Sequence, residues 1–181
     1  MTEPENDTGV IQVEHLFKSF NDEIVLNDIS FELSAGENLI ILGKSGAGKS
    51  VLLKCITGLI PPDKGRIKWL NQHVQDLDED TLNKLKKKIG FVFQGSALYD
   101  SMSLKENLLF HLDRSLGDLS VKEKDDRINE ILDKVGLADS IDKMPAELSG
   151  GMRKRAGLAR ALILQPMIIL YDEPTTGLDP A

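Results

Sequence analysis

The sequence predicts an α/β fold with a mostly parallel central sheet, an N-terminal antiparallel β layer and an α-helical subdomain. Two short runs, Asn38–Leu42 and Met167–Tyr171, are apolar on both sides, as strands in the middle of a parallel sheet are. Residues Asp28–Leu33 alternate polar and apolar side chains, which indicates a half-buried strand of an antiparallel layer. Between the two apolar runs, Ser120 and Glu123 have the spacing of a capping box and open a long amphipathic helix.

The first half of the chain contains a predicted hairpin and a helix with a clear end. Residues 11–14 alternate apolar and polar side chains, which predicts a strand that a turn at Asn21-Asp22 ends. A helix is expected after residue 50. It should end near Gly58, because Pro61-Pro62 cannot continue it. A further strand is expected at Gly65–Leu70.

The second half is predicted to be mainly helical between two strands. The first of these strands is expected at Ile89–Gln94, and the second is the apolar run that ends at Tyr171. Helices are expected from Ser103 onward and over Met152–Leu164. The helix after Ser120 should place five apolar residues on one face, Val121, Ile128, Ile131, Leu132 and Val135.

The composition is typical of a globular protein that does not cross a membrane by itself. Hydrophobic residues make up 41% and charged residues 28% of the 181 positions, and no apolar run approaches the roughly 20 residues of a membrane span. The net charge of −7 argues against nucleic acid as the main partner. Residues 1–9 are expected to form a disordered tail. Cys55 is expected to be a buried, reduced thiol, which suits a cytosolic protein.

The most informative motif is a glycine-rich run that lies between an apolar strand pattern and a helical one. Its residues are Gly43-Lys44-Ser45-Gly46-Ala47-Gly48-Lys49-Ser50, which match G-x-x-x-x-G-K-[ST]. Glycines let consecutive N–H groups face a phosphate, and the helix behind them adds its dipole. We expect Lys49 to reach the β- and γ-phosphates and Ser50 to ligate Mg²⁺. The alternative, a glycine-rich turn with an incidental lysine, does not account for the flanking pattern. The sequence therefore predicts a P-loop NTPase core.

A second motif supplies the carboxylates that the phosphate loop lacks. Asp172 and Glu173 follow the apolar run that ends at Tyr171. An aspartate at the tip of a buried strand can hold Mg²⁺. Glu173 is placed to polarise an attacking water as general base, which contributes about 10²–10⁴ in rate. Taken alone, however, two acidic residues in this position can also simply mark the point where a strand ends and a loop begins.

The segment Leu148-Ser149-Gly150-Gly151-Met152 resembles the signature motif of ABC-type ATPases. The resemblance covers nearly the whole chain in the family's order. An aromatic residue precedes the phosphate loop, Gln94 ends a strand, and Thr176-Gly177-Leu178-Asp179 after the Asp-Glu pair is similar to the D-loop. The resemblance implies ATP and Mg²⁺ as ligands and ATP hydrolysis as the activity. It also implies an ATPase domain over residues 10–181, with a core at about 10–93 and 165–181 and a helical subdomain at about 95–164.

The resemblance assigns roles to further residues. Phe20 is expected to stack on the adenine, and the alternative is that Phe20 or Phe17 is simply a core residue. Gln94 contacts Mg²⁺ and the attacking water. Ser149, Gly150 and Gly151 bind the γ-phosphate held by a second copy of the chain, so that two ATP molecules lie between two copies in a head-to-tail dimer. The implied catalytic set is Lys49, Gln94 and Glu173, the implied metal ligands are Ser50, Gln94 and Asp172, and Asp179 belongs with the ATP-binding residues.

Two features depart from the family pattern. The signature ends in Met152 where glutamine is common. The family's switch histidine lies some thirty residues beyond the glutamate, whereas His15, His73 and His111 all precede it. We therefore expect the ATPase domain to be incomplete at its C-terminal end, and the 181-residue chain to bind ATP but to hydrolyse it poorly.

The resemblance implies an energising subunit of a membrane transporter, bound at the cytoplasmic face of the inner membrane. Gly95–Ser103 would line a groove for a short cytoplasmic helix of a permease, or serve merely as a linker. Gln94–Tyr99 and Gly150–Arg155 look most similar to the Mla-type ATPases. These pair with a permease and a mammalian-cell-entry-domain protein to move phospholipid between bacterial membranes. Alternatives are a transporter of another solute and a non-transport ATPase, such as an iron–sulphur assembly factor. A third alternative is a regulatory module without catalysis, but the presence of Lys49, Asp172 and Glu173 argues against it.

Overall fold

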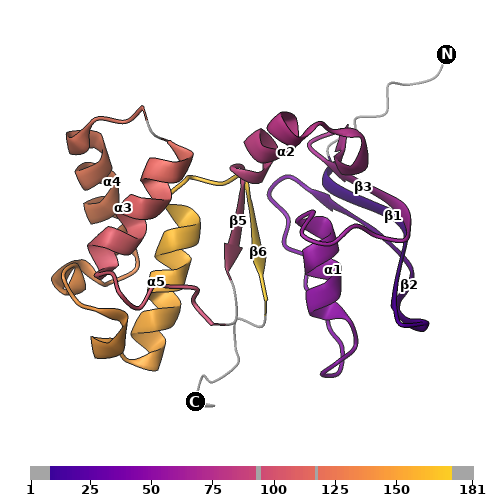
Figure 1. Ribbon diagram of the computed structural model, residues 1–181, viewed down its shortest axis with the longest axis horizontal. Helices are drawn as coiled ribbons and strands as arrows, with labels where there is room; N and C mark the ends of the chain where they lie inside the picture. Colours follow the sequence, from indigo (N-terminus) through magenta and orange to yellow (C-terminus); the bar gives the residue numbers. More distant parts are fainter. Residues whose placement is uncertain (1–8, 93–94, 117, 173–181) are drawn as a thin grey trace. The chain divides into compact units, whose positions relative to one another are not determined.

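The described part of the chain divides into two compact units. The computed structural model describes residues 9–92, 95–116 and 118–172. One unit ends at Lys86 and the other begins at Lys87. A four-stranded antiparallel sheet lies in the first unit and a two-stranded parallel sheet in the second (Figure 1). The predicted α/β class, with an antiparallel layer and a parallel sheet, is confirmed. The subdomain boundaries expected near residues 95 and 164 stay a prediction.

The antiparallel sheet begins with a long hairpin. Its strands are β1 (Gly9–Phe20), β2 (Glu23–Ser34), β3 (Lys64–Trp69) and β4 (Gln72–His73), in the order β2-β1-β3-β4. The turn residues Asn21 and Asp22 have φ values of 48° and 66°. Positive φ at both central residues is what a type I′ turn requires, and this turn matches the twist of the two strands. The predicted hairpin and its turn are confirmed.

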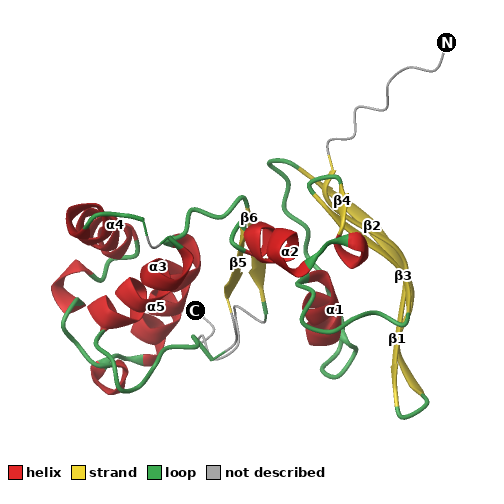
Figure 2. Cartoon of the chain, turned by 45° about the horizontal axis from the view of Figure 1, so that its top comes forward, coloured by secondary structure: helices red, strands yellow, loops and turns green. Residues whose placement is uncertain are grey.

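Helix α1 (Lys49–Ile56) lies beside this sheet in both views (Figures 1 and 2). The core of the unit contains Leu52, Leu53, Cys55 and Ile56 from α1, and Ile11, Val13, Leu16, Ile67 and Trp69 from the sheet. The Cys55 side chain is buried as expected, and burial raises the pKa of its thiol. The helix ends where predicted, because Gly58 takes a φ of 66° and the Leu59 N–H donates to the Lys54 carbonyl at 2.9 Å. After β4 the unit ends with a 3-10 turn (Val74–Asp76) and α2 (Glu79–Lys86).

The predicted strand at Asn38–Leu42 was wrong. These residues have no regular secondary structure, and Ile40 and Leu42 are 77% and 88% exposed. A run that is apolar on both sides becomes a strand only if neighbours pair with both of its edges and cover both of its faces. The strands described in the first unit pair with one another and not with this segment. The apolar pattern thus indicated that this segment needs neighbouring elements to cover it, but not that other strands pair with it.

The second unit combines two parallel strands with a helical bundle. Strands β5 (Ile89–Val92) and β6 (Ile168–Tyr171) pair in parallel register. Helices α3 (Leu104–Ser115), α4 (Val121–Lys134) and α5 (Gly150–Leu162) surround an apolar core, with 3-10 turns at Ala138–Ser140 and Pro145–Glu147 (Figure 2). The core includes Leu104, Leu108, Leu112, Ile128, Leu132, Ala156 and Ala159. No helix in the described ranges is both long enough and apolar enough to span a bilayer.

Local end signals determine where the helices of this unit begin and end. Ser103 and Ser120 each form a capping box with the glutamate three residues later. Gly136 takes a φ of 66° just beyond the last turn of α4. Val121 corrects the predicted apolar face, because it is 78% exposed whereas Ile128 is fully buried. Helical periodicity specifies a face, but not how much of its length the neighbouring helices cover.

Candidate functional site

The phosphate-loop motif forms an exposed loop in front of α1. Residues 43–47 are exposed, whereas Gly48 is buried and is the N-cap residue of the helix, with a φ of 87°. A Cβ at Gly48 would come within 2.9 Å of both Cγ1 and the carbonyl oxygen of Val25. Glycine is therefore required at position 48 by both its backbone angle and its close approach to β2. The loop starts the helix without any side-chain cap, as an anion-binding helix end does.

Lys49 turns back over the loop that precedes it. Its Nζ donates to the carbonyl oxygens of Gly43 and Lys44, both at 2.9 Å. A positive charge is thereby held against a run of exposed backbone. Ser50 follows in the first turn of α1 and is half-buried. Glycines, a helix N-terminus, an ammonium and a hydroxyl form a donor set that fits the phosphates of a nucleoside triphosphate.

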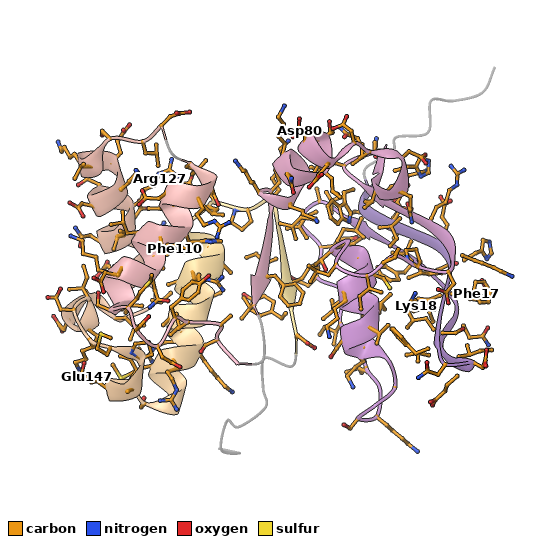
Figure 3. The ribbon with its side chains drawn as sticks, viewed as in Figure 1. Phe17, Lys18, Asp80, Phe110, Arg127 and Glu147 are labelled. Carbon is orange, nitrogen blue, oxygen red and sulfur yellow. The ribbon has the colours of Figure 1, made fainter. Side chains whose placement is uncertain are left out.

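Phe20 ends β1 and is 42% exposed, so the side chain is not a core residue. The ammonium of Lys18 lies 5.4 Å from the centroid of its ring, within the range of a cation–π interaction. Figure 3 labels Lys18 and its neighbour Phe17 at this end of β1. An exposed aromatic face at a strand end can accept a stacked base. The alternative that Phe20 packs in the core is not supported.

The signature segment forms the start of α5. The Ser149 side chain is the N-cap and accepts a hydrogen bond from the Met152 N–H at 3.2 Å. Gly150 and Gly151 are exposed, and a Cβ at either position would meet nothing within 4 Å. Met152 packs against the helical core, which explains how an apolar side chain replaces the common glutamine. The N-terminus of α5 is thus open and lined by small residues, as a phosphate site requires.

Asp172 lies directly after β6. Its backbone N–H donates to the Val92 carbonyl oxygen at 3.0 Å, which extends the β5–β6 ladder by one residue. The carboxylate therefore stands at the carboxyl end of a parallel strand pair, where α/β proteins bind ligands. Its oxygens and the Ser50 hydroxyl are the kind of ligand that Mg²⁺ prefers. Ser50 belongs to the first unit and Asp172 to the second.

Three predicted site residues, Gln94, Glu173 and Asp179, lie outside the described residues. The remaining ones fall into two groups. The first unit brings together the phosphate loop with Lys49 and Ser50, and also carries Phe20, whereas Ser149–Gly151 and Asp172 lie in the second unit. Within each group the local positions agree with the sequence prediction, and the roles stay predictions.

The segment after Gln94 is organised by a residue that the sequence analysis missed. Asn107, on α3, is fully buried, and its Oδ1 accepts the Tyr99 N–H at 2.7 Å. Its Nδ2 donates to the carbonyl oxygens of Tyr99, Met102 and Ser103 at 3.1, 2.9 and 3.0 Å. A polar residue at an otherwise apolar position of a helix is the one signal that could have found it.

Aromatic and basic groups gather beside this segment. Phe110 lies on α3 (Figure 3). The Tyr99 ring meets it edge to face at a centroid distance of 5.1 Å, and the Arg114 guanidinium lies 5.6 Å from the Phe110 centroid. Burial, and then the charge of Arg160, lower the pKa of His111 from 6.5 to about 4. His111 is therefore neutral at physiological pH. Burial also lowers the pKa of Arg160, whose Nε has no hydrogen-bond partner among the described residues.

Comparison with known sequences agrees with this geometry. A family model described as "ABC transporter" matches residues 26–176. Methionine import ATP-binding protein MetN of Brucella abortus is 36% identical over 177 residues, which cover 98% of this chain and 47% of that protein. The probable ribonucleotide transport ATP-binding protein mkl of Mycobacterium leprae is 44% identical over 170 residues, which cover 94% of this chain and 49% of that protein. Protein TRIGALACTOSYLDIACYLGLYCEROL 3, chloroplastic, of Arabidopsis thaliana is 40% identical over 186 residues (97% and 53%). The chain thus spans about half the length of these relatives.

Solved structures have the same fold. The cbiO1 protein of Clostridium perfringens, part of the ABC transporter complex cbiONQ, matches with a TM-score of 0.84 and 31% identity, over 96% of this chain and 68% of that one. The ATP-binding cassette MJ0796, solved as a dimer in a post-hydrolysis state bound to ADP and Pi, matches with a TM-score of 0.83 and 35% identity, over 93% and 76%. The predicted fold, a P-loop core with an antiparallel β layer and a helical subdomain, is confirmed. The chain belongs to the ABC transporter family, as the order of its motifs predicted.

Proposed function

We propose that this chain is the ATP-binding and ATP-hydrolysing subunit that powers a membrane ABC transporter. One observation carries the proposal most directly: the Lys49 ammonium is held 2.9 Å from the Gly43 carbonyl, over a loop of exposed backbone at the start of a helix. This arrangement concentrates positive charge and N–H donors at one place, which is what a triphosphate needs. Membership of the family supports the same conclusion.

In this proposal the first unit binds the nucleotide. The N–H groups of residues 43–48 surround the β-phosphate, and Lys49 leaves its backbone acceptors for the β- and γ-phosphate oxygens. Ser50 contributes its hydroxyl to Mg²⁺, and Phe20 stacks on the adenine. Bound Mg²⁺ would neutralise the charge that develops on the phosphate oxygens during transfer.

The carboxylates complete the chemistry. Asp172 and Gln94 would be further ligands of Mg²⁺. Glu173 accepts the proton of the attacking water as it approaches the γ-phosphorus. The test is Glu173→Gln in the full-length protein. We expect retained ATP binding and a loss of hydrolysis of at least about a hundredfold, measured by phosphate release. Unchanged hydrolysis would remove Glu173 from the role of general base.

A second copy of the chain supplies the other half of each site. Ser149, Gly150 and Gly151 begin α5 with open space around them, so that a γ-phosphate carried by another copy can approach their N–H groups. Asp179 belongs to the same interface. A solved relative is a dimer bound to ADP and Pi. We expect Ser149→Arg to leave ATP binding intact and to abolish hydrolysis, because the new side chain fills this space.

The partner in the membrane is a permease. Asn107 holds the segment 95–103 through four hydrogen bonds. The segment would offer a helix of the permease a fixed loop that includes exposed Tyr99. Binding there would keep the subunit on the cytoplasmic face of the membrane. Cell fractionation tests this location: the full-length protein should sediment with membranes when its permease is present and not when the permease is deleted.

We propose phospholipid as the transported substrate, moved by an Mla-type assembly with a mammalian-cell-entry-domain protein. Support comes from the segments Gln94–Tyr99 and Gly150–Arg155 and from a relative, 40% identical, that is named for a diacylglycerol lipid. The second candidate is methionine import, favoured by relatives that are named for it. The reconstituted transporter should transfer labelled phospholipid between vesicles in the presence of ATP. ATP-dependent methionine uptake without lipid transfer would favour the second candidate.

A further inference from the structure

Asp63 forms hydrogen bonds with the end of β1, next to Phe20. Its Oδ1 accepts from the Lys18 ammonium at 2.7 Å, and its Oδ2 accepts from the Ser19 N–H at 2.6 Å. Its own N–H donates to the Phe17 carbonyl oxygen at 2.9 Å. One residue, just before β3, therefore holds three consecutive positions of β1, and the next position is Phe20.

Lys18 links Asp63 to the aromatic ring, because its ammonium contacts both the Asp63 carboxylate and the Phe20 ring. Its side chain is only 12% exposed, so the ammonium has little freedom between the Asp63 carboxylate and the Phe20 ring. The carboxylate is 42% exposed. Hydrogen bonds from Lys18 and Ser19 hold the pKa of Asp63 below its usual range, so this carboxylate is charged throughout the physiological range.

The ring needs such a restraint because the strand around it is irregular. The β1–β2 register shifts between Leu16 and Lys18 and again between Lys18 and Ser19. The two-residue turn at Asn21-Asp22 follows immediately. A ring at this position has little sheet on either side to fix its orientation. An aromatic platform binds a base well only if it is oriented before the base arrives, because ordering it during binding costs affinity.

We propose that Asp63 is a positioning residue for the nucleobase, which orients the Phe20 ring through Lys18 and Ser19 so that an adenine can stack on it. The inference rests on the proposed role of Phe20. The simpler reading is that Asp63 only joins β1 to the start of β3. Both readings place the same hydrogen bonds in the fold, and they differ in one respect: only positioning makes the effect of Asp63 depend on the base.

The experiment compares a ligand with a base and a ligand without one. Magnesium ATP and magnesium tripolyphosphate are titrated calorimetrically into the full-length protein and into Asp63→Asn, Phe20→Leu and the double variant. Asp113→Asn is the matched control, since Asp113 pairs with Lys124 at 2.7 Å with side-chain exposures of 51% and 14%. If Asp63→Asn does not fold, Lys18→Met, with Lys124→Met as its control, removes the same link and leaves the Asp63–Ser19 hydrogen bond in place.

We expect Asp63→Asn to weaken ATP binding about fivefold to tenfold, and to change tripolyphosphate binding less than about twofold. The double variant should bind ATP no more weakly than Phe20→Leu alone, because both substitutions remove the same stacking contact. Asp113→Asn should bind both ligands like the unmodified protein.

Four results would overturn the inference. An equal loss for ATP and tripolyphosphate would assign Asp63 to the fold alone, and so would additive effects in the double variant. If Phe20→Leu weakens ATP binding and Asp63→Asn does not, Phe20 keeps its proposed role and only the inference on Asp63 fails. If Phe20→Leu leaves ATP binding unchanged, the base platform itself is wrong, and the inference fails with it.

Discussion

The Lys49 ammonium and the Gly43 carbonyl oxygen are 2.9 Å apart, so the lysine spans the whole loop that links them in sequence. The acceptors of Lys49 are backbone carbonyls of the loop, and water can replace it there because Gly43 and Lys44 are exposed. The side chain can therefore leave this position for phosphate oxygens at little cost to the fold.

Lys49→Met should weaken binding of magnesium ATP by about tenfold to a hundredfold, since a hydrogen bond to a charged group contributes roughly 1.5–3 kcal/mol. The free energy of unfolding should stay within about 0.5 kcal/mol, as for other surface substitutions. Calorimetric titration measures the first and urea unfolding the second. Lys134→Met, at an exposed ion pair on α4, is the control. Unchanged ATP binding would contradict the assignment of the loop.

Asn107→Ala should lower the free energy of unfolding by about 2–3 kcal/mol, because it removes four hydrogen bonds between a fully buried amide and part-buried backbone groups of Tyr99, Met102 and Ser103. Urea unfolding of the full-length protein measures the loss. Asn129→Ala, at an exposed position of α4, should change stability by less than about 0.5 kcal/mol. Equal stabilities of the two variants would show that Asn107 does not hold the segment.

His111 should make stability fall as the pH is lowered. Its pKa is about 4 in the folded protein and 6.5 when unperturbed, so the unfolded chain binds a proton at a pH where the folded one does not. Stability contributed by the neutral ring is thus complete above about pH 6.5 and is lost progressively down to about pH 4. Between these pH values, the melting temperature should depend less steeply on pH in His111→Asn than in the unmodified protein. An identical pH dependence in the two proteins would place His111 in a solvated site.

The first residue and the middle of α4 should respond differently to truncation. Ile128→Ala removes a fully buried side chain and should cost about 2–5 kcal/mol. Val121→Ala, at a 78% exposed position, should cost less than about 0.5 kcal/mol. Denaturant titrations of the two variants provide the comparison. A large loss at Val121 would restore the longer apolar face that the periodicity predicted.

Local chemistry explains why so much of the fold could be predicted. The turn at Asn21-Asp22, the capping boxes at Ser103 and Ser120 and the helix end at Gly136 each depend on residues within a few positions of one another. The same holds for the starts of α1 and α5, which lie where the two glycine motifs predicted helix N-termini. Such signals can be read along the chain.

Features that depend on distant residues could not be predicted. The strand pattern at Asn38–Leu42 carries no information on whether neighbours pair with it. The link from Asp63 to Lys18 joins residues 45 positions apart, and no sequence pattern relates an aspartate before one strand to a lysine near the end of another. The partners of Asn107 lie only four to eight positions away, but a polar residue at an otherwise apolar position of α3 does not indicate which groups it binds.

The central claim is that two copies of the chain form each ATP site, and mixing two variants tests it most directly. Lys49→Ala, which should bind ATP about tenfold to a hundredfold more weakly and is tested at an ATP concentration that leaves it empty, and Ser149→Arg, which should bind ATP but not contact it across the dimer, are each introduced into the full-length Glu173→Gln protein. Sedimentation with ATP should show each variant alone as a monomer. The mixture should form a heterodimer with one complete site, from Lys49 of one copy and Ser149 of the other. A mixture that stays monomeric, while the Glu173→Gln protein dimerises with ATP, would contradict the account.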